Sequence, residues 1–149
     1  MNVSLRLYKA VVHIPTSCRV PGHGFWVEDV PFESVPVERS QELRQAILTT
    51  IERGNPSISL ERVSALRDNK DNPRLKAMGV KSWHVLDRGT TGLWSITDRN
   101  GTYEIRVNQP MKPRGWHEDK TKRVDFPVGT PIDEVITRLI AMIQECARR

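Results

Sequence analysis

The sequence predicts a single α+β domain in which two main helices pack on a mostly antiparallel sheet. Three observations lead to this fold class. Segments 41–53 and 131–147 carry apolar residues at helical spacing, whereas several other segments alternate with a period of two. The Asn100-Gly101 pair separates two such alternating segments, which is the strongest local signal for an antiparallel hairpin. The chain of 149 residues has the length of one domain.

The beginning of the chain is expected to be extended. Residues 3–14 are predicted as one strand, because apolar and polar residues first alternate and an apolar run follows. Residues 15–24 are rich in proline and glycine and are predicted as a loop, and residues 25–27 as a short strand. Pro31 and Pro36 keep the following residues from forming a helix.

The two main helices have the clearest boundaries. Ser40 is the expected N-cap of the helix over 41–53, and Gly54 ends it. Thr130 is the expected N-cap of the helix over 131–147. The apolar faces consist of Leu43, Ala46, Ile47, Thr50 and Ile51 in the first helix, and of Ile132, Val135, Ile136, Leu139, Ile140, Ile143 and Cys146 in the second.

The middle of the chain carries weaker signals. Residues 55–72 are polar and are predicted as a mobile linker with at most one short helix in it. Short helices are expected after Asn72-Pro73 and after Ser82, because both sites have a capping residue. The remaining strands are predicted over 93–97, 102–107 and 123–128, with a loop over 109–120.

The composition narrows the class of protein. Apolar residues make up 38% of the chain and charged residues 28%, which excludes a disordered or collagen-like protein. No apolar run approaches the roughly 20 residues of a membrane span, and the first ten residues do not resemble a secretory signal. Two cysteines do not make a disulfide framework. A cytoplasmic protein is therefore expected.

The net charge of +5 leaves two interpretations open. A sequence pI of about 9.6 is compatible with a nucleic-acid-binding protein, and equally with a solvated surface. Much of the surplus lies in residues 99–123, which hold seven Lys and Arg residues against three acidic ones. Trp116 lies inside this stretch, as in surfaces that bind nucleic acid or a protein partner. The neighbouring Glu118-Asp119 pair would repel phosphate groups, which favours a protein partner.

Signals for catalysis are sparse. The sequence has no phosphate-binding loop, nucleophile elbow or paired metal-ligand histidines, so no cofactor and no metal are expected. Cys18 lies in the predicted loop and is expected to be exposed, where it and His23 would form a thiol nucleophile and its base. A small enzyme is thus a third hypothesis, although the chain is predicted not to be an enzyme.

Several short motifs of the second half occur together. They are Lys81-Ser82-Trp83, Arg88-Gly89, the strand over 93–97, the Asn-Gly hairpin, Gly115-Trp116-His117-Glu118-Asp119 and Phe126-Pro127. With these features, residues 75–143 resemble immunity proteins of bacterial contact-dependent growth inhibition systems. The resemblance implies a cytoplasmic, non-enzymatic inhibitor that binds the toxic C-terminal domain of a secreted protein, often a nuclease, and masks its active site.

Tight inhibition requires aromatic and arginine anchors at the interface. The expected anchors are Arg114, Trp116, His117 and Glu118 in one loop and Trp26 and His23 in a second. Because the chain is basic, it is expected to contact acidic residues of the toxin, or a surface beside its active site, and not to mimic nucleic acid. The alternative is a nucleic-acid-binding module that uses the basic 99–123 face.

Overall fold

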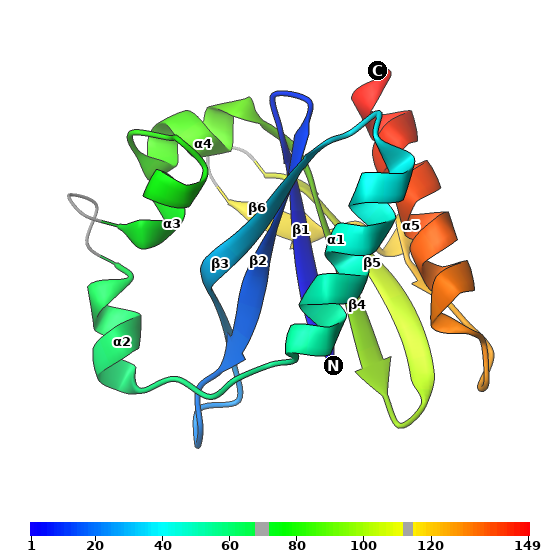
Figure 1. Cartoon of the computed structure of the whole chain (residues 1–149), viewed down its shortest axis with the longest axis horizontal. Helices are drawn as coiled ribbons and strands as arrows, with labels where there is room; N and C mark the ends of the chain where they lie inside the picture. Colours follow the sequence, from blue (N-terminus) through cyan, green and yellow to red (C-terminus); the bar gives the residue numbers. More distant parts are fainter. Residues whose placement is uncertain (68–71, 112–114) are drawn as a thin grey trace.

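The structure is a computed structural model, and it describes residues 1–67, 72–111 and 115–149. The described strands form one antiparallel sheet of seven strands in the order β3-β2-β1-β4-β5-β6, and β7 pairs with another part of β5 (Figure 1). The strands are β1 (Asn2–Tyr8), β2 (Val11–Arg19), β3 (Trp26–Pro36), β4 (Thr90–Arg99), β5 (Thr102–Pro110), β6 (Trp116–Glu118) and β7 (Val124–Asp125). The helices are α1 (Ser40–Arg53), α2 (Leu60–Ala65), α3 (Pro73–Ala77), α4 (Trp83–Gly89) and α5 (Ile132–Ala147), with a 3-10 turn η1 (Lys120–Lys122). The predicted α/β class and mostly antiparallel sheet are confirmed.

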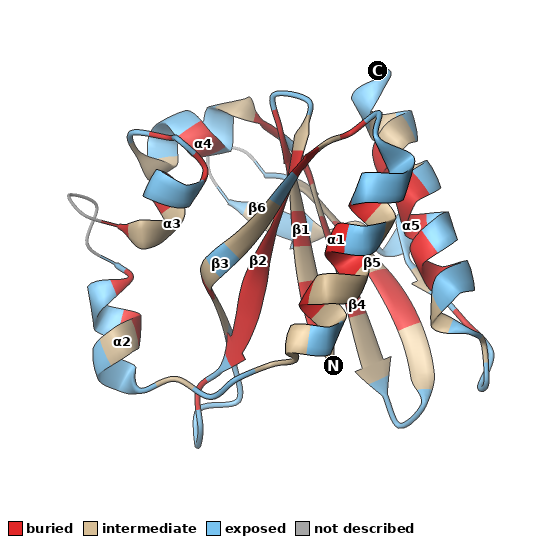
Figure 2. Ribbon diagram, in the orientation of Figure 1, coloured by how far each residue is buried: buried red, intermediate tan, exposed pale blue. Residues whose placement is uncertain are grey.

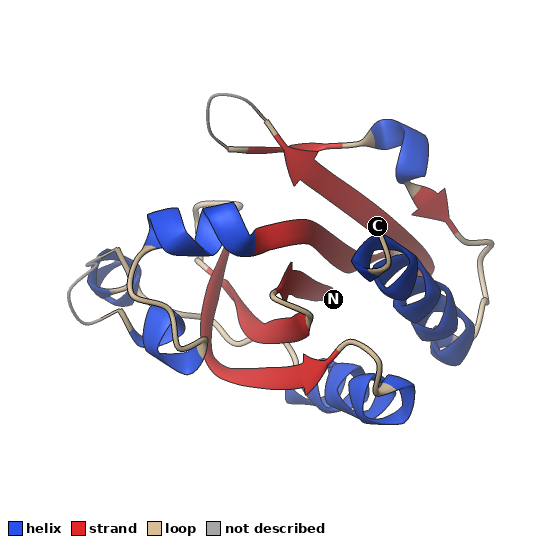
Figure 3. Ribbon diagram, turned by 90° about the horizontal axis from the view of Figure 1, so that it is seen from above, coloured by secondary structure: helices blue, strands red, loops and turns tan. Residues whose placement is uncertain are grey.

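The two long helices lie side by side on one face of the sheet (Figures 1 and 3). Arg44 of α1 joins them, donating to Asp133 Oδ1 over 2.9 Å and to Thr137 Oγ1 over 2.6 Å in α5. Helix α1 packs on β1, β2 and β3, and α5 packs on β4 and β5. The red bands of both helices in Figure 2 mark their buried residues. The core under the helices includes Val3, Leu5, Leu7, Val12, Ile14, Ile96, Ile105, Leu43, Ile47, Ile136, Leu139 and Ile143. We call this side of the sheet the helix face.

The short helices are grouped away from α1 and α5, along the β3 edge and onto the other face of the sheet (Figure 3). Arg62 of α2 forms an ion pair of 2.7 Å with the buried Asp29 of β3. The Tyr8 ring lies against Gly89 of α4, where a Cβ atom would be only 2.3 Å from the ring. A second small core of Tyr8, Leu75, Met78, Val80 and Leu86 forms there.

The prediction of one strand over 3–14 is wrong. The chain turns at Lys9 and Ala10, which have positive φ values of 47° and 62°, and β1 pairs with β2 as a hairpin. Turns of this kind favour Asn and Gly, and neither is present to signal one. The first half of the predicted loop over 15–24, residues 15–19, belongs to strand β2, which accommodates Pro15 at a shift of the β2–β3 register.

The segment predicted as a mobile linker packs against the rest of the domain from residue 55 to residue 67. Asn55 Nδ2 donates to the carbonyl oxygens of Asn2 at 2.7 Å and Ser17 at 2.8 Å. Helix α2 buries Val63, and Leu66 beyond it is fully buried. Residues 55–67 are therefore part of the packed domain, and residues 68–71 lie outside the described residues.

Local signals predicted the short helices better than the ends of the long ones. The side chains of Asn72 and Ser82 cap α3 and α4 as expected. The N-caps predicted for the long helices are wrong, because Ser40 is the first residue of α1 and Thr130 Oγ1 donates to the Pro127 carbonyl, 2.8 Å away. Gly54 ends α1 as predicted. The Asn100-Gly101 hairpin is confirmed, with positive φ at both residues. The predicted loop over 109–120 contains β6, and the predicted strand over 123–128 shrinks to β7.

Candidate functional site

The face of the sheet opposite α1 and α5 is polar and only partly covered. Register pairs Ser4 of β1 with Ser95 of β4, and Ser95 with Arg106 of β5, so these three side chains share a face. Ser17 of β2 joins the row, since its hydroxyl is 3.4 Å from that of Ser4. We call this surface, with Arg6, Asn108, Trp26 and Glu28, the open face.

Two hollows lie on the open face. One of about 520 Å³ lies between the start of β3 and strands β1, β4 and β5, with Trp26 and Glu28 on one side and Arg99 and Arg106 on the other. The second, of about 470 Å³, reaches from Trp26 to Arg6 and to Arg74 of α3. The serine side chains on the floor are short, which leaves room between the longer side chains around them.

A buried carboxylate organises the charged part of the open face. Glu104 accepts hydrogen bonds from Thr97 Oγ1 at 3.0 Å, from Arg123 Nη2 at 2.5 Å and from Arg106 Nε. Burial alone would raise the pKa of Glu104, but the hydrogen bonds from Arg106 and Thr97 and the two guanidinium charges lower it. The carboxylate is therefore ionised near neutral pH and holds both arginines in place.

Arg6 and His13 form a second polar pair on the open face, in register across β1 and β2. Arg6 Nη1 lies 3.3 Å from Thr90 Oγ1. His13 is buried, and its Nδ1 lies 2.8 Å from Ser34 Oγ. Burial, followed by the charge of Arg6, lowers the pKa of His13 to about 4. His13 is therefore neutral at pH 7 and has a structural role.

Two of the predicted anchors, Trp26 and His23, lie at the β3 end of the open face. Trp26 is 44% exposed and lines both hollows, and the Arg19 guanidinium lies 6.0 Å from its ring centre. His23 is exposed in the turn before β3, with its ring 5.9 Å from the ring of Phe25, which is 41% exposed. Trp26, Phe25 and His23 thus form an aromatic rim.

Three other predicted anchors, Trp116, His117 and Glu118, form β6 at the opposite edge of the sheet. Register with β5 places Trp116 and Glu118 on the same side as Arg106, and His117 on the other side. His117 Nε2 is 3.1 Å from Gln109 Nε2. Trp116 lines a groove of about 740 Å³ between α4 and β6, together with Trp83 of α4. Arg114 lies outside the described residues.

The predicted anchors therefore do not form one site. Trp26 and Trp116 share a side of the sheet but lie at its two edges, separated by the row of serines and arginines. One oxygen of Glu118, Oε1, is buried and has no hydrogen-bond partner among the described residues.

Arg6, Ser95 and Glu104 of the open face were not predicted as site residues. The signal that could have identified them is the alternation of polar residues with core residues at these positions.

Three of the cations described in the basic stretch 99–123 are paired with carboxylates. Arg106 and Arg123 share Glu104, and Arg123 also binds Asp125 at 2.9 Å. Lys122 Nζ lies 3.1 Å from an oxygen of Asp119. These carboxylates compensate much of the positive charge that the sequence concentrates here.

The predicted exposure of Cys18 is wrong. Its side chain is buried in β2 with the residue 2% exposed, and its Sγ lies 3.7 Å from the Thr16 carbonyl oxygen. Burial raises the pKa of the thiol, so Cys18 is protonated at neutral pH. His23 is exposed in the turn beyond, and within the described part of the chain no contact joins the two side chains. The structure therefore contains no activated Cys18–His23 pair.

Among the described residues, no group of three or more His, Cys, Asp or Glu side chains is placed to hold a metal ion. None of their helices has the length and apolar character needed to cross a membrane.

The fold has a counterpart among solved structures. A protein of unknown function from Neisseria meningitidis is similar, with a TM-score of 0.60 over 91% of this chain and 88% of that chain. The two sequences are 14% identical, so the similarity shows the fold alone. No protein-family model matches the chain, and no curated protein does.

Proposed function

We propose that this protein is a cytoplasmic, non-enzymatic immunity protein that binds a cognate toxin domain through its open face. The observation that carries the proposal is the hollow polar floor of the open face beside the aromatic rim at Trp26. The resemblance of residues 75–143 to immunity proteins of contact-dependent growth inhibition systems supplies the class of partner.

The open face has the properties of a recognition surface. Exposed tryptophan and arginine side chains are the residue types that contribute most to protein interfaces. Arg106 is held in place by Glu104, so little side-chain entropy is lost when a partner binds it. The hollow beside Trp26 has Arg99 and Arg106 on one side and Glu28 on the other, so it suits a toxin segment that presents an acidic group to the arginines and a hydrogen-bond donor to Glu28.

Nucleic acid is the less favoured ligand. Arg106, Lys122 and Arg123 are already paired with carboxylates, so phosphate groups would have to compete for them. Glu28 borders both hollows of the open face and would repel a phosphate backbone.

The test uses the C-terminal toxic domain of the large secreted protein expected to be encoded beside this chain. Titration calorimetry of the two purified proteins should give one tight, stoichiometric site. Trp26→Ala should weaken binding by at least about 2 kcal/mol, the effect of losing a central tryptophan anchor. Arg148→Ala, a change at an exposed arginine that borders none of the open-face hollows, is the matched control and should leave affinity unchanged.

Trp116→Ala separates the two sites that contain predicted anchors. If it weakens binding and Trp26→Ala does not, the partner occupies the α4–β6 groove and the open face is the wrong surface. If the protein binds no such domain, and instead captures nucleic acid with an affinity that falls steeply with salt, the immunity proposal is overturned.

A further inference from the structure

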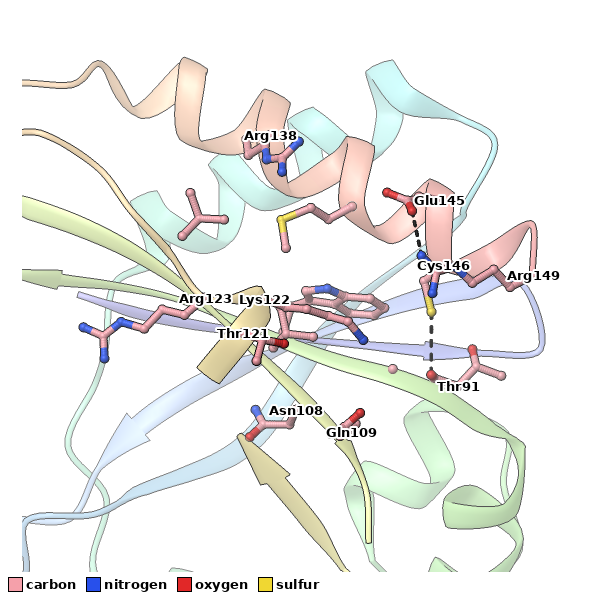
Figure 4. Close-up of a pocket in the computed structure, with 15 residues that line it drawn as sticks. Thr91, Asn108, Gln109, Thr121, Lys122, Arg123, Arg138, Glu145, Cys146 and Arg149 are labelled. Carbon is pink, nitrogen blue, oxygen red and sulfur yellow. Dashed lines mark hydrogen bonds and ion pairs between the residues drawn. The ribbon is translucent and has the colours of Figure 1, made fainter. Parts of the chain in front are cut away.

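A separate hollow of about 360 Å³ lies on the helix face, beside the C-terminal half of α5 (Figure 4). Its walls come from α5, β4, β5 and the η1 region. Its volume is within the range of small-molecule sites. Neither Trp26 nor Trp116 borders it, so it is distinct from both surfaces considered for the toxin.

The floor of this hollow is apolar. Trp94 of β4 is 3% exposed and contributes its ring, and Met142 of α5 and Val107 of β5 lie beside it. The ring lies over Gly92, where a Cβ atom would be 2.2 Å from the Trp94 ring. Glycine at position 92 is thus required for this placement of the tryptophan. Trp94 and Val107 are buried, so the apolar surface open to a ligand is that of the half-buried Met142 and Val124, beside the edge of the Trp94 ring.

The rim of the hollow is cationic. Arg138 reaches it from α5, Arg149 from just beyond the end of α5 and Lys122 from η1, whereas Glu145 is the acidic residue of the lining (Figure 4). Glu145 is occupied by Arg149, 2.7 Å away. That hydrogen bond, followed by the charge of Arg149 and with contributions from Arg138 and Lys122, lowers the pKa of Glu145.

The cations differ in how far they are already compensated. Lys122 has Asp119 at 3.1 Å, and Arg123, which also borders the hollow, is turned to Asp125 and Glu104. Arg138 forms no ion pair with any carboxylate of the described residues. A guanidinium without a partner, at the edge of an apolar hollow, is suited to bind the charged end of an anionic ligand.

We propose that this hollow binds a small amphipathic carboxylate. The apolar body of the ligand lies on Met142 and Val124, at the edge of the Trp94 ring, and its carboxylate lies between Arg138 and Lys122. This arrangement combines burial of apolar surface with a charge-assisted hydrogen bond, and it needs no metal or covalent step.

The test compares octanoate with 1-octanol on the full-length protein by titration calorimetry. Octanoate should bind at one saturable site, and octanol, which lacks the charge, should bind at least about tenfold more weakly. Arg138→Ala should weaken octanoate binding by about tenfold, because a charged hydrogen bond is lost. Arg148→Ala removes an exposed arginine of the same helix end that does not line the hollow, and should have no effect.

The location of the octanoate-binding site is tested by NMR, independently of the affinity. The Gly92 amide and the Trp94 indole signals should shift on adding octanoate, and the Trp26 indole signal should not. Met142→Trp, which fills the hollow, should abolish the shifts in a protein whose other amide signals confirm folding. Absence of saturable binding, equal binding of octanol, or equal affinities for Arg138→Ala and Arg148→Ala would each overturn the proposal.

Discussion

The two faces of the sheet are built from alternate residues of the same strands, and they differ in almost every physical property. On β1, Val3 and Leu5 point to the helix face and are buried under α1 and α5. Ser4 and Arg6, which alternate with these residues along the strand, point to the open face. The helix face carries most of the apolar burial, which is the main source of stability in a domain. The open face carries hydroxyls, ion pairs and a rim of exposed aromatic rings. One set of residues therefore stabilises the fold, and the other set is available for recognition.

Truncating a helix-face residue is the most damaging change we expect. Leu139 is fully buried in the core under α5. Leu139→Ala should lower the free energy of unfolding by about 4 kcal/mol, because apolar contact is lost and a cavity is left. Urea denaturation followed by circular dichroism measures this. A loss below about 1 kcal/mol would mean that the helix face is not the main source of stability.

The pH dependence of stability should originate on the open face, in His13. In the unfolded chain His13 takes up a proton near pH 6.5, whereas in the folded protein its pKa is lowered to about 4 by burial and then by Arg6. Between these values the unfolded state binds more protons, so the free energy of unfolding falls as the pH is lowered from about 6.5 to about 4. The full effect is on the order of 3 kcal/mol.

His13→Gln should remove that dependence and keep a hydrogen-bonding side chain next to Ser34. The comparison is best made between pH 6.5 and pH 5, above the range in which Glu104 takes up a proton. An identical slope of stability against pH in the variant and in the wild-type protein would exclude His13 as the source.

The buried carboxylate of Glu104 is a polar group of the open face that should contribute strongly to stability. Glu104→Gln keeps the shape but removes the charge that holds Arg106 and Arg123. We expect a loss of about 2 kcal/mol, the effect of weakened hydrogen bonds to charged groups. Thermal denaturation at pH 7 measures it, with Glu145→Gln on the exposed end of α5 as the control, which should change stability by less than about 0.5 kcal/mol.

The smallest effect is expected on the floor of the open face. Ser95→Ala removes a hydroxyl that borders the larger hollow, and it should change the free energy of unfolding by no more than about 0.5 kcal/mol. The same substitution is a sensitive probe of partner contact, because the row of serines lies between Trp26 and Arg106. If Ser95→Ala lowered the free energy of unfolding as much as Leu139→Ala, the helix face could no longer be regarded as the main source of stability.

Signals within one element accounted for much of the fold. The helical spacing of α1 and α5, the side-chain caps of Asn72 and Ser82 and the Asn100-Gly101 turn all depend on residues a few positions apart. Predictions failed where a long-range pairing decided the outcome. The Lys9-Ala10 turn lacks the usual turn residues and exists because β1 and β2 pair. Strand β6 is a strand because β5 offers it hydrogen-bonding partners.

The candidate site likewise has features that local sequence signals predicted and features that only long-range strand pairing decided. Trp26, Trp116 and the basic character of residues 99–123 were evident from the sequence. Their grouping was not, because β3 and β6 lie at opposite edges of one sheet.

The sequence by itself determined the α+β class, the two long helices and which residues of each strand are apolar, since hydrophobic periodicity is a local property. The tertiary structure decided which face α1 and α5 cover, that Cys18 is buried, and that Glu104 forms ion pairs with two arginines of the basic stretch. These properties arise from contacts between distant parts of the chain, and only the packed sheet brings those parts together.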